Sequence, residues 1–209
     1  MIIRIAFPLS LLVCLFTTVL AGLVAANESS MYEARYDRAL DRLQKTPPED
    51  TLLKVLQTKA GDLSEEERGL IARSVSRYSR IDGHDPYLLL ALIEIESGFD
   101  RGAVSSVGAK GLMQIRPFVA QYLAEELSMS SKKAASLHDV DTNLQIGSYY
   151  LAKMIRRYGN LSLALEAYNL GPAKMDELRQ GGELQWRFTS KVKMAMVRLK
   201  KLAIIEENA

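Results

Sequence analysis

The stretch from residue 84 to residue 98 predicts a short helix that is apolar on nearly every side. Asp85 is a suitable N-cap, and Pro86 fits the first helical position, where its missing N–H costs nothing. Gly98 is a typical helix end. Because leucine and isoleucine fill most positions between them, other elements have to surround this helix, and the chain should fold around it.

Glu96 is the exception within this helix. At about 100° per residue its side chain falls beside Leu89, Leu92 and Ile93, whereas Glu94 falls on the opposite face, which we expect to be polar. Apolar surroundings disfavour the charged carboxylate, raise its pKa and keep a proton available near neutral pH. Glu96 is therefore a candidate general acid. The alternative is a glutamate in the last turn whose side chain reaches solvent.

Composition narrows the class of protein. The chain has 209 residues, of which 48% are hydrophobic, and a formal net charge of +2. These values predict one globular unit with a sizeable core and a small accessory segment. The near-neutral charge gives no overall field for nucleic acid or an anionic membrane. Basic runs at 132–133, 156–157 and 191–201 alternate with apolar residues at helical spacing, and we interpret them as solvated helix faces.

The first 26 residues predict a secretory signal peptide. Arg4 is the only charge, an apolar run extends from 5 to 21, and Val24-Ala25-Ala26 supplies the small residues of a cleavage site. An uncleaved N-terminal anchor is the alternative, since the apolar stretch is long enough to span a bilayer. Cys14 is the only cysteine, and the residues before it do not match a lipoprotein signal. Cleavage would leave a mature chain without a disulfide or a thiolate metal site.

The rest of the chain predicts helices only, so we expect an all-α fold, a compact orthogonal helical bundle. Residues 27–80 should form a small N-terminal helical extension, either an accessory domain or a bracket for the main domain. Its predicted helices are 31–45, 52–59 and 64–80, the last opened by a capping box at Ser64 and Glu67. Residues 81–209 should form the main domain. Its further helices are predicted at 111–115, 117–127, 142–158 (capped by Asp141), 161–168, 172–179 and 188–204.

Three short motifs occur in order in this domain: Glu96-Ser97-x-Phe99, Gly111-Leu112-Met113-Gln114 and Ala167-Tyr168-Asn169-x-Gly171. They are joined by a stretch from Ala103 to Ala109 and by Asn143-x-x-x-Gly147-x-x-Tyr150-Leu151. Together they resemble the lytic transglycosylases of the soluble-lytic-transglycosylase family, whose catalytic domain has a lysozyme-like helical fold. The resemblance covers residues 81 to 202, more than half of the chain.

The resemblance implies roles for seven residues. Glu96 would be the single catalytic acid and base in a cleft that binds peptidoglycan glycan, and Tyr168 would hydrogen-bond Glu96 and orient it. The other residues implied to bind substrate are Ser97, Ser105, Met113, Gln114 and Asn169. Four of these residues have a structural alternative: Ser97 could end the helix, Ser105 could be an ordinary loop hydroxyl, and Met113 and Tyr168 could be core residues.

Other matches to the family bear on the fold. Asn143, Gly147 and Tyr150 are assigned mainly to the fold. Trp186 and Phe188 match the family's aromatic segment only loosely, and a role in stacking on sugar stays open for them.

The implied reaction cleaves the β-1,4 bond between N-acetylmuramic acid and N-acetylglucosamine and leaves a 1,6-anhydromuramic end. One carboxylate suffices because the attacking hydroxyl is tethered to the same sugar, and neither metal nor organic cofactor is needed. Two alternatives are a hydrolytic muramidase on the same fold and a non-catalytic wall-binding module of an envelope-spanning complex. In either case the partners are peptidoglycan strands, and we expect export to the periplasm of a Gram-negative bacterium.

Overall fold

Local sequence signals set the ends of the helices in the computed structural model, which describes residues 47–207. Its helices are α2 (Glu49–Lys59), α3 (Glu65–Asp82), α4 (Pro86–Ser97), α5 (Pro117–Ala124), α6 (Ser131–Ala134), α7 (Val140–Tyr158), α8 (Leu161–Leu170), α9 (Pro172–Gly181) and α10 (Arg187–Glu207). In this range there is no β-strand, only two isolated bridges within residues 104–115. The expected all-α class is therefore confirmed. None of these helices is both long and apolar enough to cross a membrane.

The helix-start signals read from the sequence are confirmed at two helices. At α3 the Ser64 side chain accepts from the backbone N–H of Glu67, whose carboxylate accepts from the Ser64 N–H at 3.0 Å. At α4 the Asp85 side chain accepts from the Tyr87 N–H at 2.9 Å. Gly98 ends α4 in the left-handed region, with φ of 59°. The helix that carries Glu96 is thus fixed at both ends by local contacts.

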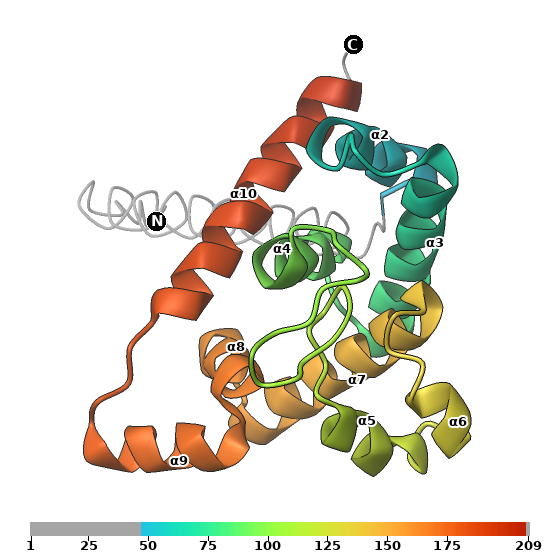
Figure 1. The fold of residues 1–209 in the computed structure, drawn as a ribbon. Helices are drawn as coiled ribbons and strands as arrows, with labels where there is room; N and C mark the ends of the chain where they lie inside the picture. Colours follow the sequence, from blue (N-terminus) through green and yellow to red (C-terminus); the bar gives the residue numbers. More distant parts are fainter. Residues whose placement is uncertain (1–46, 208–209) are drawn as a thin grey trace, which may run out of the picture. The chain divides into compact units, whose positions relative to one another are not determined.

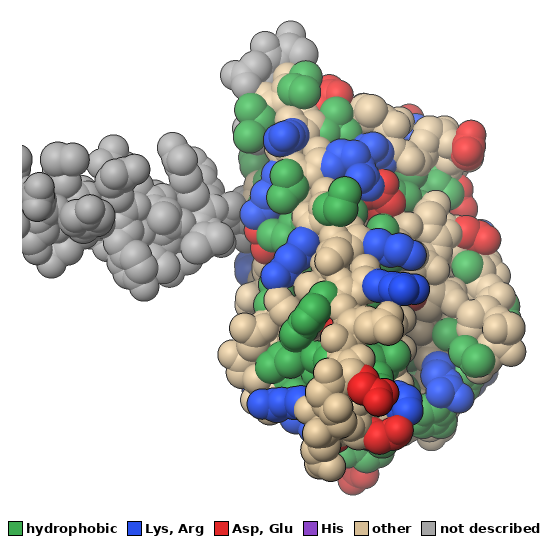
Figure 2. Space-filling model, turned by 90° about the vertical axis from the view of Figure 1, so that its left-hand side faces the viewer, with side chains coloured by type: hydrophobic (Ala, Val, Ile, Leu, Met, Phe, Trp, Pro, Cys, Tyr) green, Lys and Arg blue, Asp and Glu red, His purple; other side chains and the backbone are tan. Residues whose placement is uncertain are grey.

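Helix α4 lies in the middle of the bundle, as its composition requires. Every residue from Pro86 to Ile93 is buried. Helices α3 and α10 pack against α4, and Figure 1 shows α4 enclosed among the other helices while α10 runs along the outside. The outward face of α10 is turned to the viewer in Figure 2. The core forms where α4 meets its neighbours.

The described part of the predicted N-terminal extension packs with the rest of the domain. Helix α2 packs against α3 and α10, and α3 packs along α7. Buried residues of α2 and α3, such as Leu56 and Ile71, belong to the same core cluster as those of α4. This packing supports the bracket alternative. The predicted helix at 31–45 and the signal at 1–26 lie outside the described residues.

Three predicted local features are wrong. Residues 111–115 form turns rather than a helix, and the backbones of Lys110 and Ile115 pair with each other at 3.0 Å in both directions. Helix α7 begins at Val140 and its cap is Asp139, which accepts from the Thr142 N–H at 2.9 Å. Helix α5 ends at Ala124, before the expected residue 127, and the four-residue α6 follows it.

Gly111 gives a test of the turn at 111–115. It has a φ of 76°, and a Cβ placed there would collide with the backbone carbonyl of Leu137 and the side chain of Asn143. We expect Gly111→Ala to lower the free energy of unfolding by about 3 kcal/mol or more, because strain and a clash with backbone add together. Urea unfolding measures this loss.

Gly108→Ala is the matched control for Gly111→Ala. Gly108 lies in the same loop with a φ of 79°, but a Cβ there would meet nothing within 4 Å. The free energy of unfolding of Gly108→Ala should fall by only about 1–2 kcal/mol, the cost of a left-handed backbone conformation for alanine. Equal losses in the two variants would show that the close approach at Gly111 is not what fixes the turn.

Candidate active site

A cleft of about 630 Å³ opens beside the C-terminal end of α4. Its walls come from α4, the loop before α5, α5 itself, α7, α8 and the turn after α8. The residues that line it are Glu96, Ser105, Val107, Ala109, Gln114, Ile115, Arg116, Phe118, Val119, Tyr122, Leu123, Tyr150, Lys153, Met154, Arg157, Tyr168, Asn169, Leu170, Gly171 and Pro172. The cleft therefore brings together Glu96 and four of the six residues predicted to bind substrate.

Glu96 is half-buried in the wall of this cleft. Burial raises the pKa of its carboxyl from the usual 4.5 to about 7. No described residue donates a hydrogen bond to the carboxyl or forms an ion pair with it. A group in this state is protonated in a large fraction of molecules at neutral pH, and its proton is not engaged elsewhere in the fold. The environment expected from the sequence is present.

The backbone after Glu96 turns sharply out of the helix. Gly98 and Phe99 both have positive φ values, 59° and 69°, and the Phe99 side chain is buried. Ser97 turns its hydroxyl back to the Ile93 carbonyl at 3.1 Å and does not line the cleft. Its structural alternative, ending the helix, therefore describes it better than the implied contact with substrate.

Gln114 and Ser105 offer the cleft one polar group each. The Gln114 amide N–H groups donate to the Gly111 carbonyl at 2.9 Å and to the Ala103 carbonyl at 3.3 Å. Its side-chain oxygen is left to accept a bond from a ligand. The Ser105 Oγ accepts from the Ala109 N–H at 3.0 Å, so its own proton can be donated. Asn169 lines the cleft as an exposed side chain.

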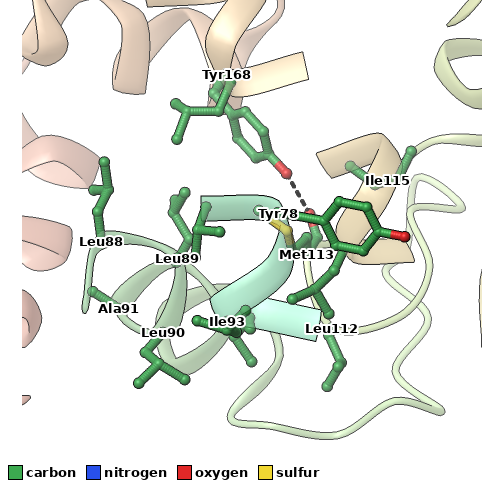
Figure 3. Packing of buried hydrophobic residues seen from close by; sticks show 14 of the residues in the cluster. Tyr78, Leu88, Leu89, Leu90, Ala91, Ile93, Leu112, Met113, Ile115 and Tyr168 are labelled. Atoms are coloured by element: carbon green, nitrogen blue, oxygen red, sulfur yellow. Dashed lines mark hydrogen bonds between the residues drawn. The ribbon is translucent and has the colours of Figure 1, made fainter. Parts of the chain in front are cut away.

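Tyr168 does not hydrogen-bond Glu96, contrary to expectation. Its hydroxyl donates to the backbone carbonyl of Met113 at 2.8 Å, and Figure 3 shows it directed at the turn that carries this residue. Burial raises the pKa of Tyr168, and the nearby Glu96 charge raises it further. The hydroxyl therefore stays a donor, and it holds the Met113–Gln114 turn against α8.

Met113 lies in the core rather than in the cleft. Its side chain is fully buried, and its backbone N–H donates to the Asn143 side chain at 2.7 Å. A Cβ on Gly147 would come within 2.5 Å of the Met113 sulfur, which explains why the helix needs a glycine here. The implied sugar contact of Met113 is wrong, and the fold assignments of Asn143 and Gly147 are confirmed.

Several cleft residues were not found from the sequence. Tyr150 was assigned to the fold, yet it lines the cleft with its ring centroid 5.2 Å from that of Tyr168. Phe118 and Tyr122 lie one turn apart on α5 and are 61% and 69% exposed. The spacing of four residues between Phe118 and Tyr122, in a helix that starts at Pro117, could have indicated this site, because it puts two aromatic side chains on one helix face. No comparable pattern in the sequence marks the cations Arg116, Lys153 and Arg157 as cleft residues.

Glu96 is the only acidic residue that lines the cleft within the described range. Four other carboxylates of the domain have structural partners. Asp100 accepts from the Gly102 N–H at 2.7 Å, Asp139 caps α7, Asp141 accepts from the Tyr78 hydroxyl at 2.9 Å, and Glu166 accepts from the Thr189 N–H at 2.9 Å. No cluster of three potential metal-binding histidine, cysteine or acidic side chains occurs in residues 47–207.

Glu94 does not lie on a free solvent face, which corrects our expectation. One of its oxygens accepts from Arg198 at 2.8 Å, and the other is buried without a hydrogen-bond partner in the described structure. This glutamate links α4 to α10.

Comparison with known proteins agrees with this site. The model of the Transglycosylase SLT domain family matches residues 73–185, more than half of the chain. The chain belongs to this family. The match contains Glu96 and every other residue that lines the cleft.

Relatives of the family are longer proteins. The soluble lytic murein transglycosylase of Salmonella typhimurium is 33% identical over 129 residues, which are 59% of this chain and 20% of the relative. The solved 70 kDa soluble lytic transglycosylase of Escherichia coli is similar with a TM-score of 0.51 and 23% identity, over 74% of this chain and 28% of that one.

A second solved structure is an inactive mutant of the Pseudomonas aeruginosa lytic transglycosylase Slt, with a TM-score of 0.50 and 24% identity over 64% of this chain and 23% of the other. Both likenesses support the lysozyme-like helical fold. The chain covers between 20% and 28% of the length of these relatives.

The raised pKa of Glu96 predicts how stability depends on pH. In the unfolded chain the carboxyl has its usual pKa of 4.5, and in the folded protein about 7, so the folded state holds the proton more tightly. Wild type should then lose stability relative to Glu96→Gln as pH rises between these values. From pH ~4 to pH ~8, the free energy of unfolding of wild type should fall by about 2 kcal/mol relative to that of Glu96→Gln. Solvent around the partly exposed carboxyl keeps this change below what the full pKa shift would give.

Urea unfolding of both proteins at the two pH values measures this change. Any effect of the amide on packing is the same at both pH values and therefore cancels. If the difference in free energy of unfolding between the two proteins did not change with pH, the Glu96 carboxyl would not be desolvated in the folded protein.

Proposed function

We propose that this protein is a peptidoglycan lytic transglycosylase that cleaves the β-1,4 bond between N-acetylmuramic acid and N-acetylglucosamine. The observation that carries the proposal is a single carboxyl in the cleft, half-buried, with its pKa raised to about 7. Ordinary glycosidases need a pair of carboxylates that flank the bond. A lone carboxyl fits a reaction in which the substrate supplies its own nucleophile.

The reaction uses Glu96 twice. As an acid it gives its proton to the glycosidic oxygen, and the bond to the muramic C1 breaks while the 2-acetamido carbonyl stabilises the electron-poor carbon. The ionised Glu96 then takes the proton from the muramic C6 hydroxyl as that oxygen bonds to C1, and a 1,6-anhydro ring forms. The tethered hydroxyl has a high effective concentration, so no water has to be activated. Glu96 ends the cycle protonated.

The cleft supplies contacts suited to a glycan. The Gln114 oxygen can accept from an acetamido N–H or a hydroxyl, and the Ser105 hydroxyl can donate. Phe118, Tyr122 and Tyr150 offer aromatic faces against which the apolar faces of sugar rings can pack. Tyr168 acts as a positioning residue, because its bond to the Met113 carbonyl holds the turn from which the Gln114 side chain reaches the cleft.

The proposed location is the periplasm, where peptidoglycan strands are the binding partner. It rests on the signal-like segment at 1–26 and on the family, whose Salmonella relative bears the name soluble lytic murein transglycosylase.

A specific observation separates this proposal from the non-catalytic wall-binding alternative. Burying a carboxyl without a hydrogen-bond partner has an energetic cost that glycan binding alone does not require. The solved Pseudomonas aeruginosa relative, described as an inactive mutant, carries glutamine in place of a glutamate. The hydrolytic muramidase alternative shares Glu96 and differs only in admitting water.

The test is product analysis of purified murein digested with wild type and Glu96→Gln. Wild type should release muropeptides that end in 1,6-anhydro-N-acetylmuramic acid. The amide keeps the size of the side chain but cannot exchange the proton, so the rate should fall on the order of a hundredfold or more. Glu96→Gln should still fold, because a neutral amide is cheaper to desolvate than a carboxylate.

Glu66→Gln is the control, because Glu66 is an exposed glutamate on α3 that does not line the cleft. Glu94→Gln is unsuitable, since it would disturb the pair with Arg198. Products heavier by one water would identify a hydrolase. Full activity of Glu96→Gln would remove Glu96 from the mechanism.

A further inference from the structure

Helix α10 carries a row of exposed apolar side chains that the cleft does not use. Met194, Val197 and Ile205 are between 55% and 69% exposed. They line a groove of about 730 Å³ between α10 and the C-terminal end of α2. Trp186, directly before α10, is 45% exposed and does not line the cleft. We call these four residues the α10 stripe.

The four side chains of the α10 stripe share one side of the helix. The Trp186 carbonyl accepts from the Ser190 N–H at 3.0 Å, so Trp186 already has the register of the helix. At about 100° per residue, the four positions then fall within roughly a third of the circumference. Exposed apolar side chains gathered on one side of a helix mark an interaction site more often than apolar residues scattered over a surface do.

The charges on α10 beside the stripe are positive up to residue 201, and the two carboxylates of α10, Glu206 and Glu207, lie at its C-terminal end. Arg187, Lys191, Lys193, Arg198, Lys200 and Lys201 lie on α10, and no acidic residue occurs from 184 to 205. Arg198 pairs with Glu94 and Lys200 with Asp85. The other four cations have no carboxylate partner among residues 47–207. Figure 2 shows hydrophobic and basic side chains running together over this face.

We propose that the α10 stripe docks on a membrane surface with anionic headgroups. An apolar row flanked by lysines and arginines is the pattern of a helix that lies in the plane of a membrane interface. Tryptophan is enriched at this depth because its ring is apolar and its N–H is polar. Each flanking cation adds attraction to anionic lipid within a Debye length of the surface. The solvated helix face expected from the sequence does not explain the exposed apolar side chains.

Charge favours a membrane over a second copy of the chain. Two copies that met through this stripe would bring together the four cations of each copy that have no carboxylate partner among residues 47–207, and these charges repel one another. An anionic lipid surface neutralises them all at once.

Docking in this way leaves the cleft open. The residues that line the groove and those that line the cleft have no member in common. Helix α10 packs on α4 and is tied to it by the Arg198–Glu94 and Lys200–Asp85 pairs. A membrane bound to α10 would therefore hold the Glu96 helix in one orientation relative to the surface.

The experiment uses the intrinsic fluorescence of Trp186, the only tryptophan in the chain, in the full-length protein. The probe is vesicles of phosphatidylcholine with phosphatidylglycerol, compared with phosphatidylcholine alone. We expect a blue shift with the anionic vesicles that salt weakens, and quenching by brominated lipid. The signal reports on the start of α10 even if residues 1–26 also bind the vesicle.

Two triple variants separate the charge pattern from total charge. Lys191→Gln, Lys193→Gln and Lys201→Gln together should weaken binding about a hundredfold, since each cation contributes roughly fivefold near an anionic surface. The control replaces three exposed cations elsewhere, Arg73, Lys132 and Lys133, by glutamine and should bind as wild type does. Circular dichroism checks that both variants fold.

Three results would overturn the proposal. One is a Trp186 emission that does not respond to anionic vesicles. Another is an equal shift with neutral vesicles. The third is a shift that depends on protein concentration without lipid, which would assign the stripe to a contact between two copies.

Discussion

Burial of α4 on all sides is the constraint on which the rest of this structure depends. Eight successive residues, from Pro86 to Ile93, are buried. At roughly 1.5–3 kcal/mol for each buried leucine or isoleucine, this segment contributes an amount comparable to the whole stability of an ordinary domain. Helices α3 and α10 have to enclose α4, and the α10–α4 contacts include two ion pairs. The same enclosure desolvates Glu96 in its last turn and raises its pKa.

Hydrogen bonds from side chains to the backbone hold the turn at residues 110–115, the part of the cleft wall that contains no helix or strand. The Asn143 side chain accepts from the Met113 N–H at 2.7 Å and donates to the Lys110 and Leu137 carbonyls at 2.9 Å each. The Tyr168 hydroxyl satisfies the Met113 carbonyl. One buried asparagine and one tyrosine thus satisfy backbone groups that a helix or strand would otherwise pair. The turn that carries Gln114 owes its rigidity to them.

Features that depend on near neighbours in the chain could be predicted from the sequence. The cap at Asp85, the capping box at Ser64 and the end of α4 at Gly98 are of this kind, and so is the apolar setting of Glu96. Features set by distant residues could not be predicted. The Gly111–Ile115 stretch was predicted to be helical from its own residues. That prediction failed because the turn is fixed by Asn143, about thirty residues away in sequence. Tyr168 was given the wrong partner for the same reason, since the nearest acceptor became known only when α8 and the turn were placed together.

Family motifs mark positions that the fold needs as well as positions that touch a ligand, and the geometry separates the two. Met113 and Gln114 are adjacent in one motif, yet the first is fully buried under Gly147 and the second reaches the cleft with its amide oxygen unengaged. Gln114 itself has a φ of 49°, a conformation that costs a residue with a Cβ about 1 kcal/mol or more. The network of Asn143 and Tyr168 offsets that cost. Burying Met113 is therefore what presents Gln114, and a motif residue without substrate contact still shapes the cleft.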